Sequence, residues 1–143
     1  MKQKLKLVEV EHEKNGYHYF LKLKINGLKA SFLVDTGATH SVMDIERFKS
    51  FSTDEKPKEN ESLSTGLGTN SMQSHYVKLK SLEIGDLKLK KFHMVLMDLS
   101  HVNQSYASMG KDPIDGVLGT NVLRKLQAVI NLNKKGAFME IKG

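Results

Sequence analysis

Apolar and polar residues alternate along the start of the chain, as they do in β-strands that bury one face. The Asn15-Gly16 and Asn26-Gly27 pairs interrupt this alternation. Asn-Gly is typical of a two-residue hairpin turn, because both residues adopt positive φ angles readily. The pattern therefore predicts a meander of three strands at residues 5–11, 17–25 and 28–34. The last of these strands ends in apolar residues and leads directly into Asp35.

Three further hairpins are predicted. Residues 61–80 predict a polar, projecting hairpin around the Gly66-Leu67-Gly68 sequence. In the other two hairpins, apolar-rich segments flank a short group of turn-forming residues, at 85–86 and at 133–136. The strands of these two hairpins are expected at residues 77–84, 87–97, 128–132 and 137–141.

Helical structure is expected mainly at one place. Thr120 can cap a short helix that extends to about residue 127, and residues 42–51 are compatible with a short helix or an irregular turn. Residues 52–60 and 100–113 are polar and are predicted to form loops. Short, closely spaced strands with one helix indicate a small all-β barrel. The length predicts a single domain over residues 1–143.

The composition excludes several classes of site. The chain has no Cys, so a disulfide scaffold, a thiol nucleophile and a thiolate zinc site are excluded. None of the six His is four residues from another, so the spacing of zinc proteases is missing and we expect no metal and no cofactor. We interpret His12 and His18 as strand-surface or packing residues. No apolar run is long enough to span a membrane and no signal-peptide pattern follows Met1, so we expect a cytoplasmic protein.

The net charge of +6 comes from 22 basic and 16 acidic side chains. Only Arg47 and Arg124 are arginines, whereas nucleic-acid-binding surfaces rely on Arg for bidentate and stacking contacts. The lysines are scattered along strand-like segments and aromatic residues are few. We therefore favour a solvated, Lys-rich surface and expect no nucleic-acid partner.

The Asp35-Thr36-Gly37 sequence is the most informative motif. An apolar strand brings the Asp35 carboxylate to a turn, the Thr36 hydroxyl can form a hydrogen bond across it, and Gly37 permits a close approach of backbone. A purely structural alternative is an Asx-type turn that ends the strand. A second element, Val117-Leu118-Gly119, lies much later in the chain, where an apolar pair and a glycine precede the predicted helix.

With these two elements the chain resembles the retropepsins, the single-domain aspartic proteases of retroviruses, retroelements and some bacterial and eukaryotic proteins. Residues 34–39 resemble the active-site turn of that family, and residues 115–123 resemble its downstream strand, loop and helix. Gly66, Leu67 and Gly68 stand where the family has its glycine-tipped flap. The resemblance implies a retropepsin-like acid-protease barrel with a flap hairpin and one short C-terminal helix.

The resemblance also implies an aspartic endopeptidase, in which two carboxylates share one proton and activate water against a peptide bond. The catalytic residue would be Asp35, supported by Thr36, Gly37 and Ala38 and by Gly119 in the downstream loop. Because the chain has one Asp-Thr-Gly, the second aspartate is expected from a second copy in a homodimer that binds a peptide or protein substrate. The terminal strand at residues 137–141 is a candidate for the dimer contact.

Three positions depart from the patterns of related enzymes. Thr39 and Thr120 stand where retroviral members usually have an Asp–Arg ion pair. Loss of both charges is self-consistent, because one buried charge without the other would be costly, but it puts the retroviral type of dimer contact in doubt. Ala38 stands where pepsin-like relatives commonly have Ser, whose hydroxyl favours the ionised carboxylate. We therefore expect activity to extend toward mildly acidic or near-neutral pH.

Alternatives remain at two residues and for the function. Asp115 could be a second acid, but the motif does not recur, and we favour a role in a local turn or a backbone hydrogen bond. His40 could border the substrate groove or lie on the surface. The alternative function is a catalytically silent, retropepsin-like dimeric module that binds a peptide or a partner. A nucleic-acid-binding barrel would explain the charge but not the motif.

Overall fold

The computed structural model describes residues 2–52, 58–59 and 75–142 and builds them mainly from β-strands. These residues form eleven strands and three helices. The strands are β1 (Lys2–Lys6), β2 (Val8–Glu11), β3 (Tyr17–Ile25), β4 (Leu28–Val34), β5 (Val42–Asp44), β6 (Lys58–Glu59), β7 (His75–Ile84), β8 (Leu87–Met97), β9 (Gly116–Leu118), β10 (Val129–Asn131) and β11 (Phe138–Lys142). The helices are α1 (Ile45–Phe48), α3 (Ser100–Ser108) and α4 (Thr120–Lys125). The predicted flap residues Gly66, Leu67 and Gly68 lie outside the described residues.

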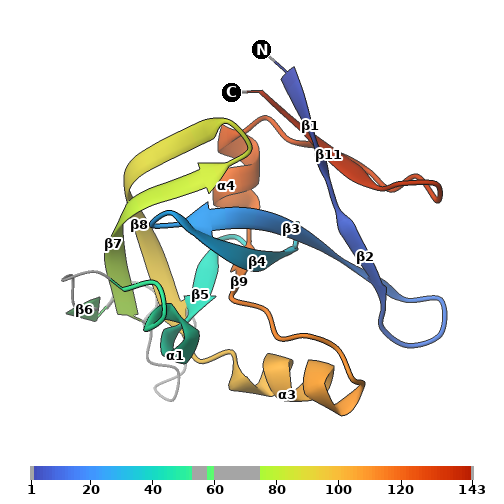
Figure 1. The fold of residues 1–143 in the computed structure, drawn as a ribbon, viewed down its shortest axis with the longest axis horizontal. Coiled ribbons are helices and arrows are strands. Elements are labelled where there is room, and N and C mark those ends of the chain that lie inside the picture. The colour runs from blue at the N-terminus through green and yellow to red at the C-terminus, as the bar shows by residue number, and fades with distance from the viewer. Residues whose placement is uncertain (1, 53–57, 60–74, 143) are drawn as a thin grey trace.

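Six strands close into a barrel (Figure 1). The larger sheet has the order β2-β3-β4-β9-β5-β8-β7-β6, and an additional pairing of β3 with β7 closes the ring. Alternate residues of these strands point inward, and fully buried side chains such as Phe32, Met43, Leu82 and Leu96 fill the interior. The structure therefore confirms the predicted all-β barrel.

Strand β9 lies between β4 and β5, which are neighbours in the sequence but not in the sheet. It runs parallel to β4, with Val34 opposite Leu118, and antiparallel to β5, with Val42 opposite Val117. The segment that connects β4 to β5 must therefore pass over the end of β9. This segment begins with Asp35.

A smaller sheet lies beside the barrel and contains both ends of the described chain, in the order β1-β11-β10 (Figure 1). Lys2 pairs with Lys142 and Lys6 pairs with Phe138, so the first and last strands are antiparallel neighbours. The predicted closing hairpin is confirmed by the pairing of β10 with β11. A hydrogen bond of 3.0 Å from the Leu7 N–H to the Ala137 carbonyl continues this contact beyond β1.

The beginning of the predicted meander is corrected by the structure. The strand expected at residues 5–11 is split at the buried residue Leu7 into β1 and β2, which belong to different sheets. The Asn15-Gly16 pair does not form a two-residue turn, because β2 ends at Glu11 and β3 begins at Tyr17. The longer loop between them has positive φ angles at Glu13 and Asn15, 70° and 65°. Burial follows odd positions up to Leu7 and then passes to Val10, so the alternation changes phase where the strand is split.

Helix α3 replaces most of the loop that was predicted at residues 100–113. Its sequence predicts no helix because it is mostly polar, it has no side-chain N-cap, and Tyr106 is its only buried residue. It packs outside the barrel in a small cluster with Phe20 and Ile114. The predicted helix after Gly119 is confirmed as α4, but Gly119 occupies the N-cap position and no side chain caps the helix.

Asp44 is a buried acid that connects two of the helices to the barrel. Its Oδ2 accepts a hydrogen bond of 2.9 Å from the Arg47 N–H and so caps α1. Its Oδ1 accepts a hydrogen bond of 2.8 Å from the Leu99 N–H, immediately before α3. Both carboxylate oxygens are therefore satisfied, as a buried charge requires.

The Asn26-Gly27 turn is confirmed, with φ angles of 52° and 83°. The Asn26 side chain also connects distant segments, because its Nδ2 donates to the Phe51 carbonyl at 2.8 Å. Its Oδ1 accepts from the N–H groups of Lys80 at 2.8 Å and Ser81 at 3.2 Å. This turn therefore joins the β3–β4 hairpin to β7, where the barrel closes.

We predict that Asn26→Ala lowers the free energy of unfolding by about 2–4 kcal/mol, because three hydrogen bonds are lost and two partly buried groups lose their partners. Urea denaturation measures this change. Asn15→Ala is the matched control, since Asn15 also has a positive φ angle but is exposed, and only its backbone N–H, not its side-chain amide, takes part in a described hydrogen bond, with Glu11 Oε2. The control should cost less than about 1 kcal/mol. Equal losses would show that the side-chain bonds of Asn26 contribute nothing.

Candidate functional site

Asp35 lies at the end of β4, where its backbone and side chain are both held. Its N–H donates to the Leu118 carbonyl at 3.0 Å, which continues the pairing with β9. Its Oδ1 accepts a hydrogen bond of 2.8 Å from the Gly37 N–H, and its carbonyl accepts one of 3.2 Å from the Ala38 N–H. Asp35 is half-buried, whereas Thr36 and Gly37 are exposed. The turn therefore orients a carboxylate that solvent can still reach.

Gly119 brings the downstream loop into contact with this turn. The Thr120 N–H donates to the Ala38 carbonyl at 2.8 Å, just after Gly119. A Cβ atom on Gly119 would lie 2.7 Å from the carbonyl oxygens of both Ala38 and His40, closer than real Cβ contacts allow. The structure thus brings together Asp35, Thr36, Gly37, Ala38 and Gly119, which the sequence analysis singled out.

Ser41 and Asn121 form a second link beneath the turn, which the sequence analysis missed. Ser41 is 2% exposed, and both its N–H and its Oγ donate to Asn121 Oδ1 at 2.8 Å. The Ser41 Oγ in turn accepts a hydrogen bond of 2.8 Å from the Gly119 N–H. The only sequence signal was that each residue lies close to one of the two motifs. The pair ties the end of the Asp35 turn to α4.

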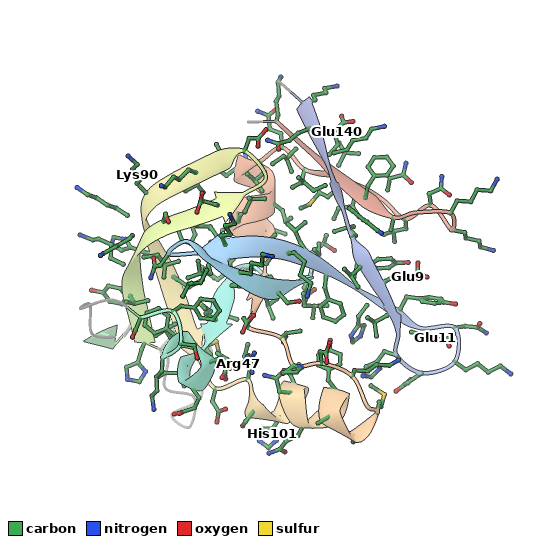
Figure 2. The ribbon with its side chains drawn as sticks, in the orientation of Figure 1. Glu9, Glu11, Arg47, Lys90, His101 and Glu140 are labelled. Atoms are coloured by element: carbon green, nitrogen blue, oxygen red, sulfur yellow. The ribbon has the colours of Figure 1, made fainter. Side chains whose placement is uncertain are left out.

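The hydrogen bond predicted for Asp115 is present, but it is not local. This buried carboxylate accepts from the Ser31 N–H through Oδ2 and from Arg47 Nε through Oδ1, both at 2.8 Å. Arg47, which projects from α1 (Figure 2), was not expected as its partner. Both oxygens of Asp115 are therefore bonded within the fold.

The two threonines that replace the retroviral ion pair lie on either side of the turn. Thr39 is exposed, and its Oγ1 is 3.1 Å from Nδ1 of His40, which is exposed as well. Thr120 is half-buried at the start of α4. His40 therefore lies on the surface beside the site.

His18 belongs to an aromatic cluster near Asp35. Its Nδ1 is 2.6 Å from the Tyr106 hydroxyl, and its ring stacks on His12 with centroids 4.4 Å apart. These contacts confirm the packing role predicted for both histidines. In the β3–β4 pairing Phe20 lies opposite Leu33. Continued by two residues, the same register brings His18 opposite Asp35. Burial lowers the pKa of His18 and the His12 ring adds to this, whereas the negative charge of Asp35 opposes it.

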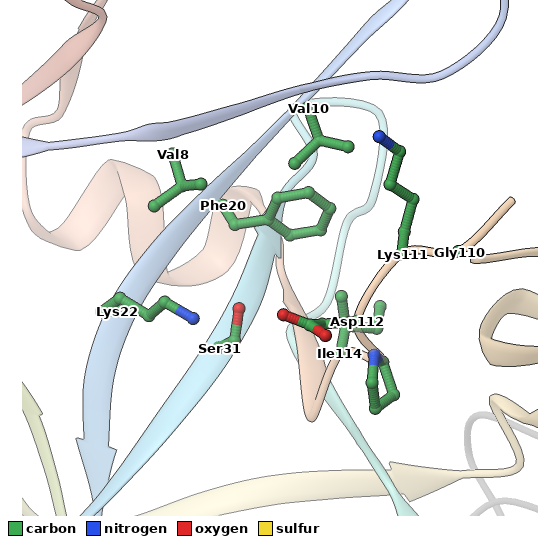
Figure 3. A pocket seen from close by; sticks show the side chains of 10 residues that line it. Val8, Val10, Phe20, Lys22, Ser31, Gly110, Lys111, Asp112 and Ile114 are labelled. Atoms are coloured by element: carbon green, nitrogen blue, oxygen red, sulfur yellow. The ribbon is translucent and has the colours of Figure 1, made fainter. Parts of the chain in front are cut away.

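A small hollow of about 180 Å³ lies on the outer face of β3 and β4 (Figure 3). Its lining residues are Val8, Val10, Phe20, Lys22, Ser31, Gly110, Lys111, Asp112, Pro113 and Ile114. Alternation along β4 places Ser31 and Leu33 on the face that leads to Asp35. The lining of the hollow combines apolar side chains with the charged residues Lys22, Lys111 and Asp112.

The described residues contain neither a metal-ion site nor a membrane-spanning helix. Across residues 2–52, 58–59 and 75–142, no group of three or more His, Asp or Glu side chains is arranged to hold a metal ion. The helices found in these ranges are all too short or too polar to cross a membrane.

Comparisons with known proteins agree with this geometry. A family model described as "Aspartyl protease" matches residues 21–122. A retropepsin-like aspartic protease from Rickettsia conorii has a similar structure, with a TM-score of 0.57 and 17% identity over 99% of this chain and 91% of that chain. EIAV protease in complex with the inhibitor HBY-793 has a TM-score of 0.53 and 20% identity over 86% of this chain and all of that chain. A search of curated protein sequences found no match. The likenesses show the retropepsin-like fold that the motifs predicted.

We predict that Gly119→Ala lowers the free energy of unfolding by about 2–4 kcal/mol, because the added methyl forces the Asp35 turn away from β9. Thermal and urea unfolding measure the loss. Gly136→Ala is the matched control, since nothing lies within 4 Å of a Cβ at that position. It should change stability by less than about 0.5 kcal/mol. Equal stability of the two variants would contradict the close packing of the turn.

A further prediction concerns the pH dependence of stability. Because the folded pKa of His18 is below its unfolded value of about 6.5, the unfolded chain binds a proton first as the pH falls. The wild type should therefore lose stability between about pH 7 and about pH 5, and His18→Gln should reduce this slope. Urea denaturation at several pH values measures it.

The matched control for this experiment is His101→Gln, because His101 lies on the outer side of α3 (Figure 2). This control should retain the wild-type slope. A slope that is the same in His18→Gln and in the wild type would show that His18 does not contribute to the pH dependence.

Proposed function

Because the chain belongs to the aspartyl protease family, we propose that it is an aspartic endopeptidase whose site contains Asp35 from each of two copies. The observation that carries this proposal is the half-buried Asp35 carboxylate, held at 2.8 Å by the Gly37 N–H at the end of β4. Asp44 and Asp115 are also bonded to neighbouring elements, but both of their carboxylate oxygens accept hydrogen bonds within the fold, whereas the described hydrogen bonds of the Asp35 carboxylate occupy only Oδ1.

The chemistry follows from two carboxylates that share one proton. The ionised carboxylate removes a proton from a water molecule, and at the same time the water oxygen attacks the peptide carbonyl carbon. The protonated carboxylate donates its proton to the carbonyl oxygen, which gives a neutral tetrahedral diol. When this intermediate collapses, the C–N bond breaks, the leaving nitrogen takes a proton from the protonated carboxylate, and the ionised carboxylate takes a proton from a diol hydroxyl, which restores a dyad that shares one proton. The role of Gly37 is to hold Asp35 in one orientation throughout, and we propose that Gly66, Leu67 and Gly68 cover the peptide.

A homodimer follows from the count of motifs, since the chain contains one Asp-Thr-Gly. A twofold axis beside Asp35 would bring the two carboxylates together. Thr36, which is exposed next to Asp35, is in a position to contact its equivalent across that axis. The second candidate function is the catalytically silent module that binds peptides. A peptide-hydrolysis assay distinguishes it from an endopeptidase.

We predict that Asp35→Asn reduces peptide hydrolysis by at least about 1000-fold, because an amide cannot take a proton from water. A pepstatin-type inhibitor should block the wild type. Asp86→Asn is the matched control, since Asp86 is exposed in the β7–β8 turn, and it should retain full activity. A wild type that binds peptides but cleaves none between about pH 3 and about pH 7 would favour the silent module.

We also predict that the inactive variant poisons the wild type. A roughly tenfold excess of Asp35→Asn should leave roughly one tenth of the activity, because most wild-type chains then pair with an inactive copy. The measurement is the hydrolysis rate at constant wild-type concentration. An excess of Asp86→Asn should not inhibit. Undiminished activity in the Asp35→Asn mixture would contradict the shared site.

A further inference from the structure

We infer that the outer face of the barrel carries a binding site for acidic polypeptide segments, formed by lysines of β3, β4 and β8 around a groove beside α1. The site lies away from Asp35 and is separate from the chemistry proposed there. The inference rests on the proposed function in one respect, namely that the bound segment belongs to a substrate.

This face is built around a row of residues that lie opposite one another on neighbouring strands. Lys29 on β4 is opposite Lys24 on β3. Lys24 is in turn opposite Glu83 on β7, which is opposite Lys88 on β8. Residues that are directly opposite in a sheet point to the same side, and the lysines of this row are all exposed. The row therefore places three positive charges and one negative charge on a strip that crosses four strands.

Two further lysines extend this strip along its strands. Lys22 precedes Lys24 by two residues on β3, and Lys90 follows Lys88 by two residues on β8, so each points to the same side as its neighbour. Lys90 projects away from the barrel (Figure 2). None of these five lysines forms an ion pair with a carboxylate in the described part of the chain. Their charges are therefore available to a partner.

The opposed pair Lys24 and Lys29 is unfavourable for the isolated chain. Like charges directly opposite each other on one side of a sheet destabilise the pairing of the two strands. A carboxylate bound between the two amino groups would remove this repulsion. The pair also makes a mutational test possible, because replacing either lysine does not take away a stabilising contact.

A groove of about 780 Å³ lies among these side chains and contains Lys22, Lys24 and Lys29. Arg47 of α1 lines it as well, and its side chain is 41% exposed. The buried carboxylate of Asp115 accepts from Arg47 Nε at 2.8 Å and so fixes the guanidinium. Because this contact occupies Nε, the Nη groups can donate to a bound carboxylate.

The chemistry of the groove favours a polypeptide over a nucleic acid. Glu83 and Asp112 also line it, and the N–H groups of a bound peptide can donate to their carboxylates, whereas phosphate groups would be repelled. No aromatic residue of the described chain lines the groove, although proteins that bind single-stranded nucleic acids stack bases on aromatic side chains. An acidic polypeptide segment is therefore the occupant that fits.

The groove lies along β4 from the Asp35 turn. Ser31 lines both this groove and the smaller hollow, where it lies near Lys22 (Figure 3). Ser31 precedes Asp35 by four residues and Lys29 precedes it by six. At about 3.3 Å per residue, these positions are roughly 13 Å and roughly 20 Å from Asp35 along the strand. An extended substrate would therefore reach the lysines with acidic residues about four to six positions from the cleaved bond.

The first test measures binding to the inactive Asp35→Asn chain, so that the readout does not depend on activity. The probe is a fluorescent peptide of about eight Glu residues, followed by anisotropy at about 0.1 M salt, where only nearby charges act on it. Lys24→Glu combined with Lys29→Glu should weaken binding at least about tenfold.

The matched control for this test is Lys134→Glu combined with Lys135→Glu. It makes the same change of net charge, but in the exposed turn between β10 and β11. It should weaken binding less than about twofold. Thermal unfolding of both double variants checks that each is folded.

The second test uses the active chain and two peptide substrates that differ only in the segment about four to six positions from the cleaved bond, which is Glu in one and Gln in the other. The Glu substrate should have a KM at least about fivefold lower with a similar kcat, because the added contacts lie away from the reacting atoms. Lys24→Glu combined with Lys29→Glu should remove this difference.

The outcomes separate the two proposals. Binding that depends on Lys24 and Lys29, in a protein that cleaves no peptide, would support the acidic-segment site and reject the proposed function. Cleavage of both substrates with equal KM would reject this inference and leave the proposed function intact, as would equal loss of binding in the two double variants of an active enzyme. A single-stranded oligonucleotide that binds this face more tightly than the Glu peptide would overturn the choice of a polypeptide.

Discussion

The insertion of β9 between β4 and β5 is the constraint on which the site depends. Because these two strands are consecutive in the sequence, the connection between them must cross the end of β9, and Asp35 begins that connection. The Leu118 carbonyl and the Gly119 and Thr120 N–H groups then bond to Asp35, Ser41 and Ala38 respectively. The turn is thus held by a strand that comes much later in the chain. A side chain at Gly119 would remove the space that this arrangement needs.

Two buried carboxylates, those of Asp115 and Asp44, also hold strands of the barrel in place. Asp115 lies immediately before β9 and is bonded to the Ser31 backbone on β4 and to Arg47 on α1. Asp44, at the end of β5, is bonded to the backbone of α1 and to that of Leu99 before α3. Both oxygens of each carboxylate accept hydrogen bonds, which compensates the cost of removing the charge from water. The same bonds fix the end of the strand beside each aspartate. By contrast, Asp35 is only half-buried and is open to solvent, as the proposed role in proton transfer requires.

The smaller sheet, β1-β11-β10, contains both ends of the described chain. Its β1-β11 pairing holds the two ends of the described chain together, and β11 is paired on both edges. β10 contains no charged residue, and its Ile130 lines a groove of about 380 Å³ together with Thr36 and residues of α4. The hydrogen bond of 2.9 Å from the Lys142 N–H to the Leu126 carbonyl links β11 to the end of α4, so the smaller sheet is anchored to the helix that follows Gly119.

The sequence by itself determined the strands with strong alternation and the turns at Asn26-Gly27 and Gly85-Asp86, because a period of two and a positive φ preference are properties of adjacent residues. It also determined the motifs around Asp35 and Gly119, since their residue types are what a tight, closely packed turn requires. Only the tertiary structure decided the split at Leu7, the helix α3, the Ser41–Asn121 link and the partners of Asp115. The same holds for the terminal sheet, in which β11 lies between β1 and β10. The physical reason is that each of these features depends on contacts between residues far apart in the chain, which no local pattern encodes.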